Sequence, residues 1–265
     1  MNPLEPITLQ AVSALVFPLC RVGGFFATLT VFSGTGVPVR FRALLSLMFT
    51  ICVLPAIPAP PEDLTPFSLT GFLVVCKEML IGCGIGFMTS FLSQIFTLAG
   101  QAVAMQTGLG FASMVDPVSG SNAPVVGQFF TILTTLTFLA INGHIIFIEL
   151  LIMSFKTLPV GLSFLTLDGL SDIAYFGSYL FEGGLSLSIS ANCTMLVVTF
   201  TLGVMTRAAP QLHIFSVGFA VSMIVGLFVL HQVLRAYLVN FMASFNEIMS
   251  LTCTLIGTAC EDGVF

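Results

Sequence analysis

Residues 71–100 read GFLVVCKEMLIGCGIGFMTSFLSQIFTLAG, a run in which only Lys77 and Glu78 are charged. A helix of about 20 residues crosses a bilayer, so this stretch is longer than one crossing needs. Small residues recur along it at spacings of three and four, which places them on one face of a helix. They are Gly82, Gly86, Ser90, Ser93, Thr97 and Gly100. Such a stripe lets another backbone approach closely, although glycine and serine are also common in membrane helices generally, and the stripe does not indicate whether its partner is internal or external.

The composition of the whole chain points the same way. The 265 residues are 57% hydrophobic and 7% charged, with a mean hydropathy of +1.09, whereas a soluble domain carries about 25% charged residues. Too few charges are present to build a water-facing surface, so the sequence predicts a protein of the lipid bilayer, of a large apolar assembly, or of both. The net charge of −5 includes no basic patch or tail, which argues against nucleic-acid binding.

Six apolar segments predict an all-α, polytopic membrane fold built of helical hairpins. They lie at roughly 7–32, 41–57, 71–98, 125–153, 175–203 and 212–239. The second segment is short and bounded by prolines, which leaves a re-entrant or peripheral position open. The third and fourth are longer than one crossing, which predicts tilt, kinks or protrusion from the membrane.

The charges between these segments predict the orientation of the chain. The first loop contains Arg40 and Arg42 and the fifth contains Arg207, whereas the second and fourth loops are acidic. Basic loops favour the cytoplasm, so six crossings would place both termini outside. No lysine or arginine precedes the first apolar segment, so a cleaved signal peptide is not expected.

Arg21 is the only charged residue inside the first apolar segment. An arginine at the bilayer centre costs from about 2.5 to more than 10 kcal/mol, so it needs an acid, carbonyl groups or water beside it. Two interpretations follow. Arg21 belongs to a transport pathway, or it forms a structural ion pair, for instance with Glu78 or with an acid on another chain. We favour the structural pair.

The sequence contains no motif typical of a catalytic, metal or cofactor site. HExxH, GxSxG, a phosphate-binding loop and a dinucleotide-binding GxGxxG that opens a helix are all missing. No pair of histidines or cysteines has metal-ligand spacing. We therefore expect a protein that is not an enzyme and that has no cofactor.

Five segments occur in the order expected of a known family. They are LCRVGGFFATLTVFSGTGVPVRFRALLSL (19–47), KEMLIGCGIGF (77–87), AGQAVAMQTGLGFASMVDP (99–117), NGHIIFI (142–148) and TRAAPQLHIFSVGF (206–219). In these segments, and over nearly the whole chain, the sequence resembles the FliR family, the R subunit of the flagellar type III protein export gate, which has counterparts in virulence secretion systems. The chain departs from the family pattern at His213, where asparagine is usual, and this leaves the role of that position in doubt.

The resemblance implies a structural and gating subunit in the bacterial inner membrane, within the flagellar basal body. With the P and Q export-gate subunits it would form the entry pore for unfolded export substrate proteins, and a membrane protein that switches substrate specificity would be a further partner. Residues 1–169 would form a P-like helical part and residues 170–265 a Q-like helical hairpin that turns at 206–211. The family's helices assemble into a helical cone raised partly out of the membrane, so the six segments need not all cross the lipid.

The resemblance also implies a pore-plugging loop at about 108–122. The residue types agree, because glycines allow compact turns and the apolar side chains can fill a narrow lumen. Irregular backbone at membrane depth is tolerated only where protein or a cavity surrounds it. The expected plug residues are Gly108, Gly110, Phe111, Met114, Val115, Asp116 and Pro117. An ordinary exposed turn is the alternative.

A stand-alone polytopic secondary transporter is the main alternative class of protein. Transporters often contain inverted repeats with matching broken helices around a site at mid-membrane. The glycine-rich loop after the third segment has no counterpart after the sixth, so the two halves of this chain do not match. A transporter would also purify alone or as a small homo-oligomer, whereas a gate subunit would purify with unlike chains.

Overall fold

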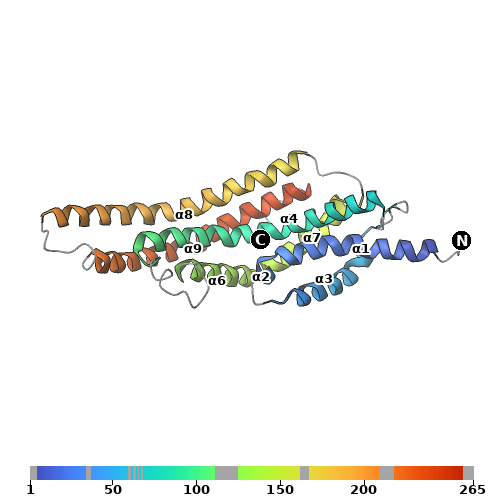
Figure 1. Ribbon diagram of the computed structural model, residues 1–265, viewed down its shortest axis with the longest axis horizontal. Coiled ribbons are helices and arrows are strands. Elements are labelled where there is room, and N and C mark those ends of the chain that lie inside the picture. Colours follow the sequence, from blue (N-terminus) through green and yellow to red (C-terminus); the bar gives the residue numbers. More distant parts are fainter. Residues whose placement is uncertain are drawn as a thin grey trace. The chain divides into compact units, whose positions relative to one another are not determined.

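The computed structural model describes residues 5–33, 37–58, 61, 64, 66, 68–110, 125–161, 167–208 and 218–258. Every element within these residues is helical, as the sequence predicts (Figure 1). The elements are α1 (Glu5–Thr28), α2 (Thr30–Ser33), α3 (Val39–Val53), the short 3-10 helix η1 (Leu54–Ala56), α4 (Leu69–Thr107), α6 (Val125–Ala140), α7 (Gly143–Thr157), α8 (Leu167–Ala208) and α9 (Phe219–Ile256). A helix satisfies its backbone N–H and C=O groups internally, which apolar surroundings require.

Four helices among the described residues are long and apolar enough to cross a membrane. They are Val39–Ala56, Leu69–Thr107, Gly177–Met205 and Phe219–Ile256, and the pair formed by α6 and α7 would be a fifth span. The apolar part of α1, Val12–Thr28, is shorter. The chain is thus an all-α polytopic membrane protein. The second predicted segment has prolines at its ends, and it is nevertheless long enough to span a membrane.

The fourth predicted segment is broken into two helices rather than one. α6 and α7 meet at a bend of 67°, beside Asn142, whose φ of 57° is left-handed. Asparagine adopts this conformation more readily than most residues because its short side chain can bond locally. The carbonyl of Asn142 accepts hydrogen bonds from the N–H groups of Ile145 and Ile146 and so begins α7. The kink that the length of the segment predicts is therefore located at Asn142–Gly143.

The predicted end of the sixth segment, residue 239, is too early. The helix α9 continues beyond it to Ile256. The apolar run stops near Asn240, but a helix needs only backbone hydrogen bonds and packing to continue through polar positions. α9 ends where Gly257 takes a φ of 73°. The N–H of Thr258 then donates to the carbonyl of Cys253 at 3.0 Å, which is the bonding pattern of a glycine-terminated helix.

The chain forms two compact units. Unit 1 comprises Met1–Phe91, Phe138–Tyr175 and Glu247–Phe265, and unit 2 comprises Leu92–Thr137 and Phe176–Asn246. In unit 1, the ring of Phe26 on α1 lies edge-on to Phe32 and to Phe49 of α3, with centroid distances of 5.8 and 5.6 Å. In unit 2, aromatic rings of α4, α6 and α9 gather around Tyr237.

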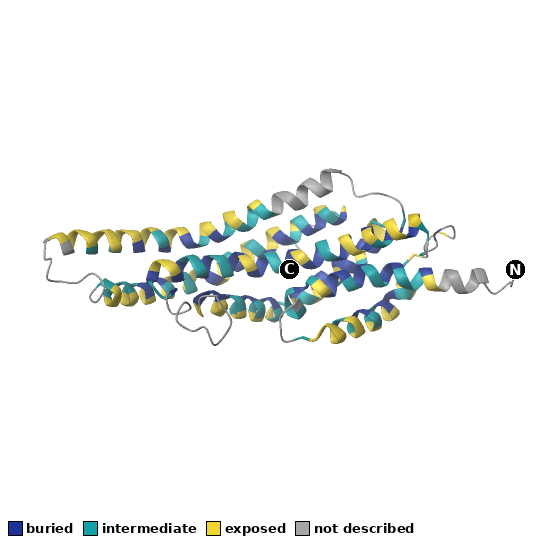
Figure 2. Ribbon diagram, viewed as in Figure 1, coloured by how far each residue is buried: buried dark blue, intermediate teal, exposed yellow. Residues whose placement is uncertain are grey.

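The helices differ in how far their own chain covers them. Half of the most apolar window of α4 is buried, against 17% for the corresponding windows of α3, α8 and α9. Figure 2 shows this contrast as dark blue along α4 and yellow along α3 and α8. α4 is thus a core helix, while α3, α8 and α9 present apolar faces to lipid or to other chains.

Candidate functional site

Arg21 and Glu78 are brought together in unit 1 by α1 and α4. Arg21 Nε donates to Glu78 Oε2 at 2.6 Å, and both side chains are completely buried. Arg21 Nη1 donates to the carbonyl and the hydroxyl of Ser154 at 2.8 and 3.1 Å, and Nη2 donates to the carbonyl of Leu158 at 2.8 Å. The guanidinium carbon lies 4.2 Å from the centre of the Phe155 ring, a cation–π contact. These are the contacts of a structural residue whose charge is satisfied by its own chain.

The partners of Arg21 lie at the C-terminal end of α7. The last carbonyls of a helix lack intrahelical donors and carry partial negative charge, so cations stabilise this end. Lys77 adds a second cation there, because its Nζ donates to the carbonyl of Gly161 at 3.0 Å. Glu78 Oε1 accepts no hydrogen bond among the described residues. The sequence could not identify these carbonyl acceptors, because every residue type has a carbonyl.

The first half of the small-residue stripe forms the contact between α1 and α4. A side chain at Gly82 would overlap the backbone of Arg21, and one at Gly86 would overlap the hydroxyl of Thr28. Ser90 Oγ donates to the carbonyl of Thr28 at 2.8 Å. The two backbones are in direct contact at these positions, and Gly82 lies against the residue whose side chain forms the buried ion pair.

The second half of the stripe lies in unit 2 and faces α6. Ser93 is buried, and its carbonyl accepts a hydrogen bond of 2.8 Å from Thr97 Oγ1. The hydroxyls of Thr97 and Thr131 are 2.7 Å apart, and a Cβ at Gly100 would lie 2.6 Å from the Phe130 ring. Five of the six stripe residues thus contact α1 or α6 of this chain, and the sixth, Ser93, is buried.

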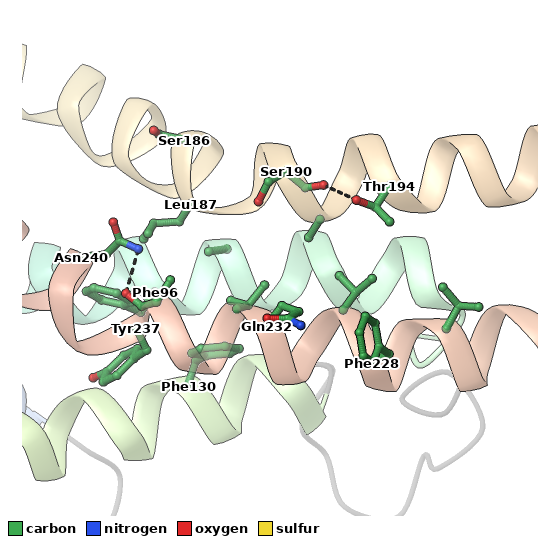
Figure 3. Close-up of a pocket in the computed structure, with 16 residues that line it drawn as sticks. Phe96, Phe130, Ser186, Leu187, Ser190, Thr194, Phe228, Gln232, Tyr237 and Asn240 are labelled. Carbon is green, nitrogen blue, oxygen red and sulfur yellow. Dashed lines mark hydrogen bonds between the residues drawn. The ribbon is translucent and has the colours of Figure 1, made fainter.

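A groove of about 380 Å³ lies in unit 2, with α8 on one side and α9 on the other (Figure 3). Tyr237 lines it, with its ring 5.1 Å from Phe96 and 6.2 Å from Phe130 between centroids. The Tyr237 hydroxyl donates to Thr134 Oγ1 and Thr137 Oγ1, both at 3.3 Å. The polar lining residues are Ser186, Ser190 and Thr194 of α8 and Gln232 and Asn240 of α9. The lining contains no charged group, so the groove suits an apolar side chain rather than acid–base chemistry. The sequence did not predict it, because four helices contribute residues with no common motif.

Two of the expected plug residues are described, Gly108 and Gly110. Gly108 ends α4 with a φ of 79°, the left-handed conformation that favours glycine after a helix. The N–H of Gly110 donates to the carbonyl of Ala104 at 2.9 Å. The other expected plug residues, Phe111, Met114, Val115, Asp116 and Pro117, lie outside the described residues.

Similarity to known proteins extends along almost the whole chain. The family described as bacterial export proteins, family 1, matches residues 12–248. The flagellar biosynthetic protein FliR of Escherichia coli (strain K12) is 33% identical over 240 residues, which cover 91% of each chain. FliR of Pectobacterium carotovorum subsp. carotovorum is 33% identical over 83% of each chain. FliR of Bacillus subtilis (strain 168) is 26% identical over 82% of this chain and 84% of its own. This chain therefore belongs to the FliR family of bacterial export proteins.

Proposed function

We propose that this chain is a structural and gating subunit of the flagellar protein export gate. With the P and Q subunits it forms the inner-membrane entry pore for unfolded export substrates, and the membrane protein that switches substrate specificity is a further partner. The observation on which this proposal rests is the 33% identity, over 91% of both chains, to a protein named flagellar biosynthetic protein FliR. The four or five helices of spanning length support a location in the membrane.

The uncovered helix faces support a role in assembly. Phe200 of α8 is 71% exposed and Ile224 of α9 is 73% exposed, and similar apolar residues flank both. Large contiguous apolar surfaces indicate lipid or protein contact. We assign residues 170–265 to the Q-like hairpin and 1–169 to the P-like part. In this assignment α8 and α9 are the two arms of the hairpin, which add to a ring of similar hairpins from the partner subunits.

The gating part of the proposal concerns the loop at about 108–122. A pore wide enough for an unfolded chain must be sealed against ions at rest, and apolar side chains seal a narrow lumen by excluding water as well as by bulk. The loop contains Phe111, Met114 and Val115 for this purpose and only one charged residue, Asp116. The left-handed Gly108 lets the backbone leave α4 immediately before the loop.

Co-purification tests the assembly. The tagged chain is expressed together with the P and Q subunits and isolated in mild detergent. We expect it to retain both unlike chains. Isolation of the chain alone, or as a homo-oligomer, would contradict the proposal and would favour the stand-alone transporter.

Conductance tests the gating. Deletion of residues 111–115 should leave a complex that assembles but passes small ions, whereas deletion of residues 119–123 from the same loop is the control of equal length. The leak should depend on the presence of the P and Q subunits. A complex that lacks 111–115 and is as tight as the parent would show that the loop is not the seal.

A further inference from the structure

The outward face of α9 in unit 2 is an apolar band with polar residues at its centre. The exposed apolar residues are Ile224, Leu227 and Phe228 on one side of the centre and Leu238, Val239 and Met242 on the other. From Ile224 to Met242 the helix rises about 27 Å at 1.5 Å per residue, close to the hydrocarbon thickness of about 30 Å. Between the two halves lie His231, Gln232 and Arg235, which are all exposed.

Arg235 lies near the middle of this band. It makes no hydrogen bond or ion pair with any other described residue. A different position of the membrane along α9 would still place a charged residue in the hydrocarbon. Any span of about 20 residues within Phe219–Ile256 includes Arg235, unless it begins beyond Arg235 and then includes Glu247. α9 therefore carries a charge with it into any membrane that it crosses, which is costly unless the charge is paired.

Lipid and bulk water both fit this face poorly. A lipid-facing Arg235 would lie in hydrocarbon without a counter-ion. A water-facing band would expose Ile224, Val239 and their neighbours, which range from 43% to 75% exposed, to solvent on both sides of the arginine. A protein surface that is apolar at both ends and acidic at its centre matches the whole band, because a carboxylate satisfies an arginine in a low dielectric.

Pairing of α9 with α9 of a second copy does not supply that carboxylate. Two copies inserted with the same orientation can pair α9 only in parallel, and a two-fold axis then places like residues opposite each other. Arg235 would meet Arg235 of the second copy, and like charges repel strongly in an apolar interface. Because the proposed function surrounds this chain with unlike membrane subunits, we assign the partner helix to one of them.

We propose that the α9 face formed by His231, Gln232 and Arg235 docks a membrane-spanning helix of an unlike subunit, which presents an aspartate or glutamate to Arg235. This inference rests on the proposed function, since it requires assembly with unlike membrane proteins. Phe228 and Gln232 belong both to this face and to the lining of the groove between α8 and α9 (Figure 3). An apolar side chain from the docking helix, near its acid, fills the groove and anchors the contact.

Substitution of Arg235 tests the charge pairing. The tagged chain is co-expressed with the P and Q subunits, and the retained unlike chains are quantified for the parent and for Arg235→Leu. Loss of one member of a buried charge pair weakens association by about 30-fold or more, so we expect retention to fall at least that far. Arg40→Leu is the matched control, because Arg40 is exposed at the start of α3. Thermal unfolding of the isolated Arg235→Leu chain should match that of the parent, since Arg235 is exposed and makes no hydrogen bond or ion pair with a described residue.

Photo-crosslinking identifies what covers the face. A photoreactive residue at Leu238, one turn beyond Arg235 and 58% exposed, should form an adduct with a helix of an unlike subunit that contains an acid. Exchange of that acid for lysine should restore retention to Arg235→Glu. An adduct with lipid alone or with a second copy of this chain would overturn the inference, as would equal retention by the parent and Arg235→Leu. Failure of the parent itself to retain unlike chains would instead contradict the proposed function.

Discussion

Replacement of Arg21 by methionine should destabilise unit 1 because it leaves a buried carboxylate without its counter-ion. Arg21 donates four hydrogen bonds, to Glu78, to the carbonyl and hydroxyl of Ser154 and to the carbonyl of Leu158. Methionine keeps much of the volume and supplies none of these donors. Glu78 is fully buried, and one of its two oxygens accepts no hydrogen bond from the part of the chain that the structure describes. The substitution therefore removes two things at once: the counter-charge of Glu78 and the hydrogen-bond donor that the described residues give it.

The expected loss in the free energy of unfolding follows from the acceptors that Arg21 leaves without a donor. Breaking one side of a buried ion pair costs about 3–5 kcal/mol. The carbonyl of Ser154 still accepts from the N–H of Leu158 at 2.9 Å, so only the carbonyl of Leu158 adds an unmet acceptor. A second substitution, Glu78→Met, removes the stranded carboxylate. The double variant should recover much of the lost stability, because apolar residues often replace a buried ion pair at little cost.

Thermal unfolding in detergent, followed by far-ultraviolet circular dichroism, measures these differences. A loss of about 3 kcal/mol corresponds to a fall in Tm of roughly 6–12 °C for a chain of this size. Arg40→Met controls for the removal of an exposed arginine and should leave Tm unchanged within about 2 °C, since surface substitutions usually change stability by less than about 0.5 kcal/mol. If Arg21→Met and Arg40→Met unfold at the same temperature, or if the double variant is less stable than Arg21→Met alone, the electrostatic reasoning is wrong.

Three further substitutions probe the packing in the same unfolding measurement. Gly86→Leu should lower the free energy of unfolding by about 1–3 kcal/mol or more, because the larger side chain overlaps α1. Gly23→Leu should lower it less, because a Cβ at Gly23 meets nothing within 4 Å. Equal losses for the two variants would contradict close packing at Gly86. Tyr237→Phe should lower the free energy of unfolding by about 0.5–1.5 kcal/mol, because the hydrogen bonds of the hydroxyl are lost. Tyr237→Ala should lower it by about 3–5 kcal/mol, because the ring is lost. A larger loss for Tyr237→Phe than for Tyr237→Ala would refute the idea that the ring dominates this core. Asn142→Gly should leave the free energy of unfolding nearly unchanged. Asn142→Val should lower it by about 1–2 kcal/mol, because valine is strained at positive φ. Equal Tm values for the two variants would show that the bend does not depend on this residue.

The helical membrane fold was predictable because it depends on properties that every segment displays. Within lipid, the backbone of a long apolar run must satisfy its own hydrogen bonds, and a helix does so within a single segment. The pairing of Arg21 was predictable in kind, since a buried arginine needs an acceptor, and Glu78 lies in the next long apolar segment that contains an acid. The six-residue stripe was predictable as a packing surface because its spacing matches one helix face.

Other features depend on which surfaces meet, and a single sequence does not encode this locally. The stripe looks alike whether it packs against α1 and α6 or against another subunit. The bend at Asn142 has a local cause, but asparagine–glycine also occurs in straight loops and turns. The acceptors of Arg21 at the end of α7 are backbone carbonyls, which leave no trace in residue type. The groove beside Tyr237 arises from four helices and required the structure to reveal it.

Arg21 and Arg235 separate a part of the chain that folds alone from a part that requires assembly. Arg21 is surrounded by hydrogen-bond acceptors of its own chain, so its burial is compensated as soon as α1, α4 and α7 pack. Arg235 has no such compensation from the described residues, although it also lies within a long apolar helix. An unpaired charge in lipid is unfavourable, so placing the α9 face in the membrane without a partner carries a cost. A partner helix with a carboxylate would remove that cost, so binding energy at Arg235 would favour the assembled state over the free subunit.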